Sequence, residues 1–300
     1  MARPGIAVSV VIATYMREDQ LVQSIRSLML EKFPHELIVV DQTPTHKLET
    51  EAFLASLPVN WCRWYRIQPP SLPAARNFGL ARARAPVVLF LDDDVIVEPG
   101  LLHAHWRLYR DDPNVAAVAG RVRVDGERQS TQLYQLGRLG GARGGFDFPR
   151  TATVQTVRGC NMSFHTARLR EVGGFDSRFI GNAIREETDV CFRLRAAGFG
   201  IRYVPEAAVV HMEAPEGGCT EGLPLSEVPA FYRNELLFFL KHGSRALLIP
   251  FLLLKFRHHV LRRDALRAGR IWRRSRAFAE GCVDGVRAYR STASTTSRSP

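Results

Sequence analysis

Runs of apolar residues and segments of helical spacing alternate along the first 125 residues of the chain. The runs are rich in β-branched residues and predict strands buried on both faces, while apolar positions three and four residues apart predict helices between them. An alternation of this kind is typical of parallel βαβ units. The predicted strands are 7–13, 36–41, 61–67, 87–92 and 115–124, and the predicted helices are 20–30, 48–57, 73–84 and 101–110.

The pattern becomes less regular after residue 125. Five glycines between 137 and 145 predict a mobile loop, and a helix over 185–197 precedes two short predicted strands at 200–204 and 207–211. Nearly everything beyond Ser226 has helical spacing. The predicted domains are a catalytic domain at 1–213, a loop or linker at 214–228, a basic helical region at 229–290 and a disordered tail at 291–300.

The charge of the chain is concentrated in its last 60 residues. Residues 241–300 contain 14 Lys and Arg against 3 Asp and Glu, so they account for the whole net charge of +11. Such a segment suits an anionic membrane surface, with Arg263, Arg267, Arg270 and Arg274 as candidate contacts. A helix whose basic face is merely solvated is the alternative. A helical stripe predicted to pack against the rest of its own domain is formed by positions 261, 265, 268, 272, 275, 279, 282 and 286.

Other features of composition bound the class of protein. With 46% apolar and 24% charged residues the chain is an ordinary globular sequence. Its five cysteines are scattered without a CxxC pair, which indicates free thiols in a reducing compartment. The longest apolar run, 246–254, is far shorter than the roughly 20 residues of a spanning helix. We therefore expect a cytoplasmic protein, with peripheral attachment to the inner membrane face as a further hypothesis.

The strand predicted at 87–92 runs directly into three carboxylates, Asp92, Asp93 and Asp94. Ligands of open α/β sheets lie at the carboxyl ends of the strands. Asp92 and Asp94 project to the same side of an extended chain, so their oxygens could share one Mg²⁺ or Mn²⁺. The alternative is a solvated acidic turn that closes a strand.

Six blocks in this order resemble the family 2 glycosyltransferases, which use nucleotide sugars and have the GT-A fold. The blocks span about residues 8–212 and are SVVIATYMRED, ELIVVD, LPAARNFGLARARAPVVLFLDDD, GCNMSF, VGGFD and EETDVCFRLRAAGFGIRYVPEAAVVH. The resemblance implies an α/β, Rossmann-like and mostly parallel sheet flanked by helices, followed here by a helical extension. It also implies an inverting transfer of a sugar from a nucleoside-diphosphate donor to a hydroxyl of a carbohydrate, lipid-linked or small-molecule acceptor.

The resemblance assigns roles to particular residues. The donor would contact Thr14, Tyr15, Arg17, Asp41, Arg76 and Asp92, and a divalent metal would be held by Asp92, Asp94 and His211. A carboxylate, a hydroxyl and an aromatic ring at neighbouring strand ends can bind a nucleobase, and a guanidinium can face a base or a phosphate. Asp93 is expected to point away. A capping role for Asp41, a surface ion pair for Arg76 and a structural imidazole at His211 are the alternatives.

The acceptor side begins at Glu186 and Glu187, where the family has an acidic pair whose second member is the general base. Glu187 is therefore the predicted base, although the usual pair is Glu-Asp and the second residue here is longer. Either carboxylate would also favour the positive end of a helix dipole. Gly159 and Asn161 are expected to shape the floor of the acceptor pocket.

Other classes of function fit the sequence less well. A sugar nucleotidyltransferase would need a glycine-rich phosphate loop after the first strand, and IATYMRED is not one. A non-catalytic protein on this scaffold would be expected to lose the Asp triplet or the Glu pair. No nucleic-acid partner is predicted, because the catalytic domain carries no net charge. Cell-surface polysaccharide or glycolipid synthesis is the favoured pathway, and modification of a small secondary metabolite is the alternative.

Overall fold

The computed structural model describes residues 5–213, 217–218, 224–261 and 270–291. They form two compact units. Unit 1 contains the described residues of Met1–Gln135, Arg143–Asp176 and Glu187–Gly218, and unit 2 contains those of Leu136–Ala142, Ser177–Glu186 and Cys219–Pro300.

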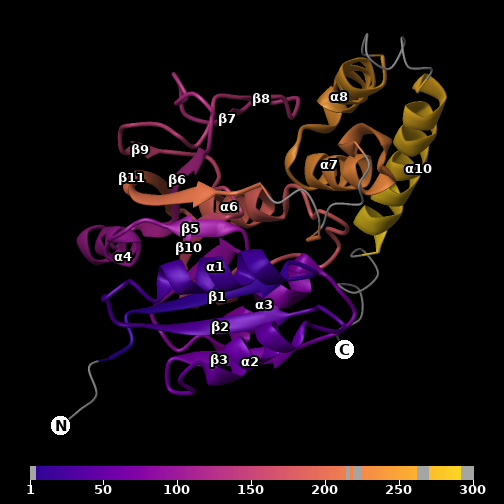
Figure 1. Ribbon diagram of the computed structural model, residues 1–300. Helices are drawn as coiled ribbons and strands as arrows, with labels where there is room; N and C mark the ends of the chain where they lie inside the picture. The colour runs from indigo at the N-terminus through magenta and orange to yellow at the C-terminus, as the bar shows by residue number, and fades with distance from the viewer. Residues whose placement is uncertain (1–4, 214–216, 219–223, 262–269, 292–300) are drawn as a thin grey trace, which may run out of the picture. The chain divides into compact units, whose positions relative to one another are not determined.

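Unit 1 is built on a nine-stranded mixed sheet (Figure 1). Strands β3, β2, β1 and β4 are neighbours in that order and are parallel. Strand β10 then runs antiparallel to both β4 and β6, and β11 lies parallel to β6 with β5 and β9 antiparallel beside it. The strands are β1 (Val8–Thr14), β2 (His35–Asp41), β3 (Cys62–Arg66), β4 (Val87–Asp92), β5 (Val95–Val97), β6 (Val115–Val124), β9 (Ala152–Thr153), β10 (Asn161–His165) and β11 (Gly200–His211).

The central strands are buried on both faces, as their continuous apolar runs predict. Val10, Val11 and Ile12 of β1 are fully buried, and so are Val39 and Val40 of β2. Helices between the strands complete the parallel βαβ units. The helices are α1 (Glu18–Leu28), α2 (Leu48–Ser56), α3 (Leu72–Arg82), α4 (Leu101–Asp111), α5 (Thr166–Glu171) and α6 (Glu186–Ala196).

The predicted α/β class with a mostly parallel sheet and a helical C-terminal region is confirmed. All five strands and all four helices predicted in the first 125 residues are present, with ends shifted by a few residues. Residues 200–211 form one strand rather than two, because a register shift between Val204 and Ala208 lets β11 continue past the interruption. The short strands β5 and β10 were not predicted.

Unit 2 contains the helical end of the chain. One of its core clusters includes Leu236, Phe239 and Phe251, whose two phenylalanine rings stack with centroids 4.2 Å apart. The helical segments are the 3₁₀ turns η1 (Leu225–Glu227) and η2 (Arg245–Leu247), the α-helices α7 (Pro229–His242), α8 (Leu248–Lys255) and α10 (Ile271–Arg290), and the π-helical turn η3 (Phe256–Val260). No helix among the described residues is long and apolar enough to cross a membrane.

The glycine-rich segment 137–145 is more structured than predicted. It contains the short strand β8 (Ala142–Arg143), which pairs with β7 (Gln135–Leu136) just before the segment. The carbonyl oxygen of Gly140 accepts hydrogen bonds from Arg185 and Lys255, at 2.9 and 3.1 Å. Both cations also pair with the buried carboxylate of Glu235, at 2.9 and 2.7 Å. Two cations and a carboxylate thus fix the turn, which the expectation of a mobile loop did not anticipate.

Cys282 and Val286 of the predicted stripe do pack against the core of unit 2, but they are only part of the packing face of α10. Its buried residues are Arg274, Ala277, Gly281, Gly285 and Ala288, whereas Trp272 on the predicted stripe is 72% exposed. Small residues let two helices approach closely but carry little hydrophobic signal. Buried Arg274 lies 3.8 Å from Glu227, so it is unavailable to a membrane surface, while Arg263 and Arg267 lie outside the described residues.

Candidate functional site

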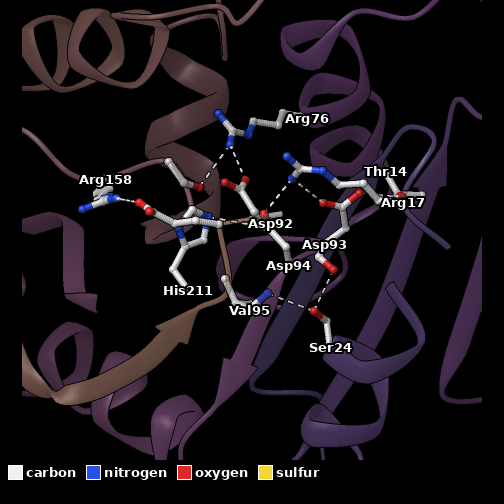
Figure 2. Close-up of polar contacts among 12 residues, drawn as sticks. Thr14, Arg17, Ser24, Arg76, Asp92, Asp93, Asp94, Val95, Arg158 and His211 are labelled. Atoms are coloured by element: carbon white, nitrogen blue, oxygen red, sulfur yellow. Dashed lines mark hydrogen bonds and ion pairs between the residues drawn. The ribbon is translucent and has the colours of Figure 1, made fainter. Parts of the chain in front are cut away.

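The acidic turn lies where β4 ends and β5 begins. Ser24 of α1 holds this turn, because its hydroxyl donates to the carbonyl oxygen of Asp93 at 2.8 Å and accepts from the backbone N–H of Val95 at 3.0 Å (Figure 2). In the β5–β11 ladder Val95 is paired with His211. This register brings the histidine at the end of β11 beside the acidic turn, although the two are far apart in sequence.

Two arginines from different parts of unit 1 pair with the three carboxylates (Figure 2). The guanidinium of Arg17 lies 3.1 Å from Asp93 and 2.8 Å from Asp94. Arg76 of α3 lies 3.1 Å from Asp92. The fold thus offsets much of the repulsion among three adjacent negative charges.

His211 completes the set, with its Nε2 atom 3.1 Å from the Oδ1 atom of Asp94. Burial acts to lower the pKa of His211, but the hydrogen bond and the charge of Asp94 outweigh it and raise the pKa. Burial raises the pKa of the Asp93 carboxyl to about 7, against the opposing effects of Arg17 and the Thr14 hydroxyl. The pKa of Arg17 is raised, since its two carboxylate partners outweigh its own desolvation.

Three side chains around this turn, from the end of β4, the residue before β10 and the end of β11, lie close enough together that they could hold a metal ion. One ligand atom from each of Asp92, Cys160 and His211 lies within 4.8 Å of the other two. The side chain of Asp92 is 31% exposed, so its carboxylate is accessible. Carboxylate ligands suit Mn²⁺ and Mg²⁺, and Mg²⁺ commonly binds through one or two carboxylates together with substrate phosphates. Asp94 is within reach of His211, so the three predicted metal ligands are brought together.

The predicted donor residues of β1 and β2 already make contacts within the protein. The hydroxyl of Thr14 donates to Asp93 at 2.7 Å. Asp41 is fully buried and accepts hydrogen bonds from His46 at 2.6 Å, from the Trp64 indole at 2.9 Å and from a backbone N–H at 2.9 Å. Tyr15 is half-buried next to Thr14. Asp41 therefore fixes the segment that follows β2, and the face it could offer a nucleobase is occupied by these partners.

Gly159 and Asn161 flank Cys160 at the start of β10. The carbonyl oxygen of Gly159 accepts a hydrogen bond from Arg76 at 3.1 Å, and a Cβ atom at Gly159 would lie only 3.1 Å from that guanidinium. The absence of a side chain thus lets Arg76 reach both this carbonyl and Asp92. Asn161 is fully buried, and its amide nitrogen donates to the carbonyl oxygens of Arg121 and Ala207 at 3.0 and 2.9 Å. These contacts favour a structural role for its side chain.

The acidic pair opens α6, the position where a carboxylate interacts favourably with the helix dipole. Glu186 is 1% exposed, whereas Glu187 is half-buried. Thr188 lies 3.4 Å from a carboxylate oxygen of Glu187 and in turn accepts from Thr156 at 3.1 Å. Glu187 is thus the more accessible carboxylate of the pair.

The backbone before the pair is unusual. Arg185 has φ +77°, a left-handed conformation that is uncommon for residues with a side chain. Its side chain is held by Glu235 and by the carbonyl oxygen of Gly140. The chain passes from unit 2 to unit 1 immediately after Glu186.

The sequence reasoning missed Cys160, Ser24 and His46. Cys160 lies opposite the acidic turn because Asn161 pairs with Leu91 in the antiparallel β4–β10 ladder. No local pattern predicts that ladder. The GCNMSF block, already noted around Gly159, was the only available signal.

The sheet order and the position of the acidic turn define a GT-A glycosyltransferase fold. The chain belongs to glycosyl transferase family 2, whose sequence model matches residues 9–172. This confirms the family that the six sequence blocks predict.

A curated relative and two solved structures are similar to this chain over different shares of its length. The pre-mycofactocin glycosyltransferase of Mycobacterium tuberculosis is 33% identical over 197 residues, which is 64% of this chain and 39% of that protein. The structure of GalNAc-T7 with UDP, GalNAc and Mn²⁺ has a TM-score of 0.63 at 14% identity, covering 79% of this chain and 48% of that one. The mannosyltransferase PcManGT of Pyrobaculum calidifontis, in complex with GDP-Man and Mn²⁺, has a TM-score of 0.54 at 14% identity and covers all of this chain and 85% of that one.

Proposed function

We propose that the chain is a metal-dependent, inverting glycosyltransferase that moves a sugar from a nucleoside-diphosphate donor to an acceptor hydroxyl. The observation that carries the proposal is the meeting of Asp92, Asp94 and His211 at one end of the sheet in a family 2 chain. The UDP, GDP-Man and Mn²⁺ named with the two similar structures support a nucleotide-sugar donor and a divalent metal.

The residues around the acidic turn would divide the work of binding the donor. Asp92 and His211 would hold the divalent cation, with Asp94 either joining them or orienting His211 from 3.1 Å. Bound there, the metal would offset the negative charge that develops on the diphosphate as it leaves. Arg76 keeps the carboxylate of Asp92 in place, and Arg17 neutralises the more deeply buried Asp93 and Asp94.

Glu187 would act as the general base. Its carboxylate takes the proton of the acceptor hydroxyl while the oxygen bonds to the anomeric carbon, and the bond from that carbon to the diphosphate breaks with its electron pair leaving on the diphosphate. A single displacement of this kind inverts the anomeric centre. The hydroxyl of Thr188 donates to the carboxylate at 3.4 Å and accepts in turn from Thr156.

Two classes of acceptor have support. The excess of basic residues near the C-terminus favours a lipid-linked or carbohydrate acceptor at an anionic surface, with the protein peripheral to the membrane and serving polysaccharide or glycolipid synthesis. The name of the Mycobacterium tuberculosis relative, a pre-mycofactocin glycosyltransferase, favours an acceptor related to pre-mycofactocin instead.

The test is donor binding by the full-length protein across a panel of UDP-, GDP- and dTDP-sugars, with and without Mn²⁺. A donor at a hundred times its Kd raises the free energy of unfolding by about 2.7 kcal/mol, which thermal unfolding detects without any acceptor. We expect at least one donor to stabilise the protein only with the metal, and release of the nucleoside diphosphate to follow the same requirement.

Variants locate that effect. Asp92→Asn and Asp94→Asn should abolish the metal-dependent stabilisation and the release of product. Asp111→Asn is the matched control, because Asp111 is 49% exposed at the end of α4 and pairs only with its neighbour Arg110 among the contacts described.

Donor binding that is unchanged by EDTA or by both site variants would contradict the metal site. Binding of donors with no transfer to any acceptor would favour the non-catalytic alternative, and pyrophosphate-dependent formation of a nucleotide sugar would favour a nucleotidyltransferase.

A further inference from the structure

Unit 2 contains an apolar cavity of about 420 Å³ among α7, α8 and α10. Figure 1 shows these three helices grouped in the orange and yellow part of the chain. The volume falls within the range of about 300–1,000 Å³ typical of small-molecule sites. The cavity is lined by Leu236, Leu240, Leu248, Leu252, Cys282, Val283, Val286, Arg287 and Arg290.

The cavity exists because α10 uses its small residues to pack on α7. A Cβ atom at Gly281 would lie 2.3 Å from the carbonyl oxygen of Pro229, and one at Gly285 would lie 3.2 Å from the Cβ atom of Leu236. The two helices therefore touch along the glycine face. The neighbouring apolar face of α10, with Cys282 and Val286, is left over to form a wall of the cavity.

The cavity also has a defined polarity. Among the described residues that line it, only Arg287 and Arg290 are charged, and both are exposed. Arg287 pairs with Asp284 at 3.1 Å. Long basic side chains at the mouth of an apolar space suit a ligand with an apolar body and an anionic head.

We propose that this cavity binds the hydrocarbon chain of a single anionic amphiphile, whose phosphate or carboxylate head is held by Arg287 and Arg290. The amphiphile enters as a monomer, so the site differs from attachment to the surface of a bilayer. Ile249 and Leu253 of α8, which are 71% and 65% exposed, are the residues that bilayer attachment would use instead. The proposal is independent of the chemistry at the acidic turn of unit 1.

The test uses the full-length protein and alkyl phosphates below their micelle-forming concentrations, with binding followed by calorimetry. Dodecyl phosphate should bind, and dodecyl maltoside, which has the same chain and a neutral head, should bind more weakly. Shortening the chain to decyl and octyl phosphate should weaken binding about fourfold per methylene removed, as expected for a buried chain. Binding that ignores chain length would overturn the proposal.

Variants separate the cavity from the general positive charge of the chain. Arg287→Gln and Arg290→Gln should each weaken dodecyl phosphate about fivefold and leave dodecyl maltoside unchanged. Two other arginines of α10 serve as matched controls. Arg276→Gln matches Arg287→Gln, because both arginines pair with an acidic residue of the same helix. Arg273→Gln matches Arg290→Gln, because both arginines are exposed. Equal losses in the controls and the cavity variants would show non-specific attraction and refute the site.

A chemical probe reports occupancy directly. The Cys282 thiol lies in the cavity wall, and burial raises its pKa to about 11. Dodecyl phosphate should slow alkylation of Cys282 by N-ethylmaleimide, as measured by peptide mass mapping. Val286→Phe fills the cavity and should remove that protection, and cooperative unfolding of the variant would show that it is still folded. Undiminished alkylation with ligand present would contradict the proposal. A second result would also contradict the proposal. In it, phosphatidylglycerol vesicles bind wild type and Val286→Phe equally, and dodecyl phosphate binds neither protein.

Discussion

His105 lies on α4 with its imidazole ring fully buried, and we predict that the stability of unit 1 depends on pH through this residue. Its Nε2 atom lies 2.9 Å from the amide oxygen of Asn161, and its Nδ1 atom lies 2.9 Å from the hydroxyl of Ser163. The amide oxygen can only accept, so Nε2 carries the proton and Nδ1 accepts from Ser163. Tyr109 completes the network at 2.8 Å from Ser163. The network is satisfied only by a neutral imidazole.

The magnitude follows from the shift in pKa. Burial lowers the pKa of His105 from 6.5 to about 4, and the hydrogen bond with Asn161 opposes this only in part. The unfolded chain therefore takes up a proton near its ordinary pKa while the folded chain does not, so the free energy of unfolding falls as the pH is lowered between these values. One pKa unit corresponds to about 1.4 kcal/mol, so lowering the pH through the whole interval reduces the free energy of unfolding by about 3 kcal/mol. The contribution is intact above the ordinary pKa and lost below the folded one.

The assay is urea denaturation from pH 7.5 to pH 4 in a Trp272→Phe background. The other three tryptophans lie in unit 1, so their fluorescence reports on that unit alone. His105→Gln keeps a hydrogen-bond donor but cannot titrate. It should be less stable than wild type at pH 7.5, and the difference should shrink by about 3 kcal/mol toward pH 4. His103→Gln, at an exposed position of the same helix, is the control and should run parallel to wild type. Parallel curves for wild type and His105→Gln would refute the reasoning.

Three further outcomes are expected. Glu187→Gln should lower kcat by roughly 10²- to 10⁴-fold with little change in donor affinity, as for a general base, and a larger loss from Glu186→Gln would reverse the assignment. Glu235→Gln should destabilise unit 2 by about 3–5 kcal/mol, measured by the fluorescence of Trp272, because it leaves two buried cations without their carboxylate; an unchanged midpoint in urea would contradict this. Gly79→Ala should lower the midpoint in urea by forcing a Cβ atom to 2.4 Å from a valine of β1, and full stability would show that the helix can shift.

The parallel half of the sheet could be predicted because its signal is local. Each strand of β1, β2 and β4 is an apolar run buried on both faces, and each helix between them has a spaced apolar face. The strands β5 and β10 could not be predicted in the same way. Three residues, Val95–Val97, are too few for a pattern, and Asn161–His165 mixes polar and apolar residues that are buried only because β4 and β6 flank it.

The candidate site shows the same division. Asp92 and Asp94 could be identified because they directly follow a strong strand signal. Cys160 could not, because its position opposite Asp92 depends on the antiparallel ladder of β10.

Part of the packing face of α10 was missed for another reason. Gly281 and Gly285 are valuable at that interface for the side chains they lack, and hydrophobic periodicity cannot register an absent side chain.

The order of strands in the sheet explains how three adjacent carboxylates, two of them buried, can lie side by side. Strand β4 lies between β1 and β10. Arg17, three residues after the end of β1, therefore lies beside Asp93 and Asp94 at the end of β4. Helix α3, which leads into β4, supplies Arg76 to Asp92. The antiparallel pairing of β5 with β11 places His211, the last residue of β11, beside Asp94. Because each partner comes from a different element, the charge balance of the turn exists only in the folded protein. A ligand that binds there meets carboxylates whose positions are already fixed, and little ordering of the turn is needed on binding.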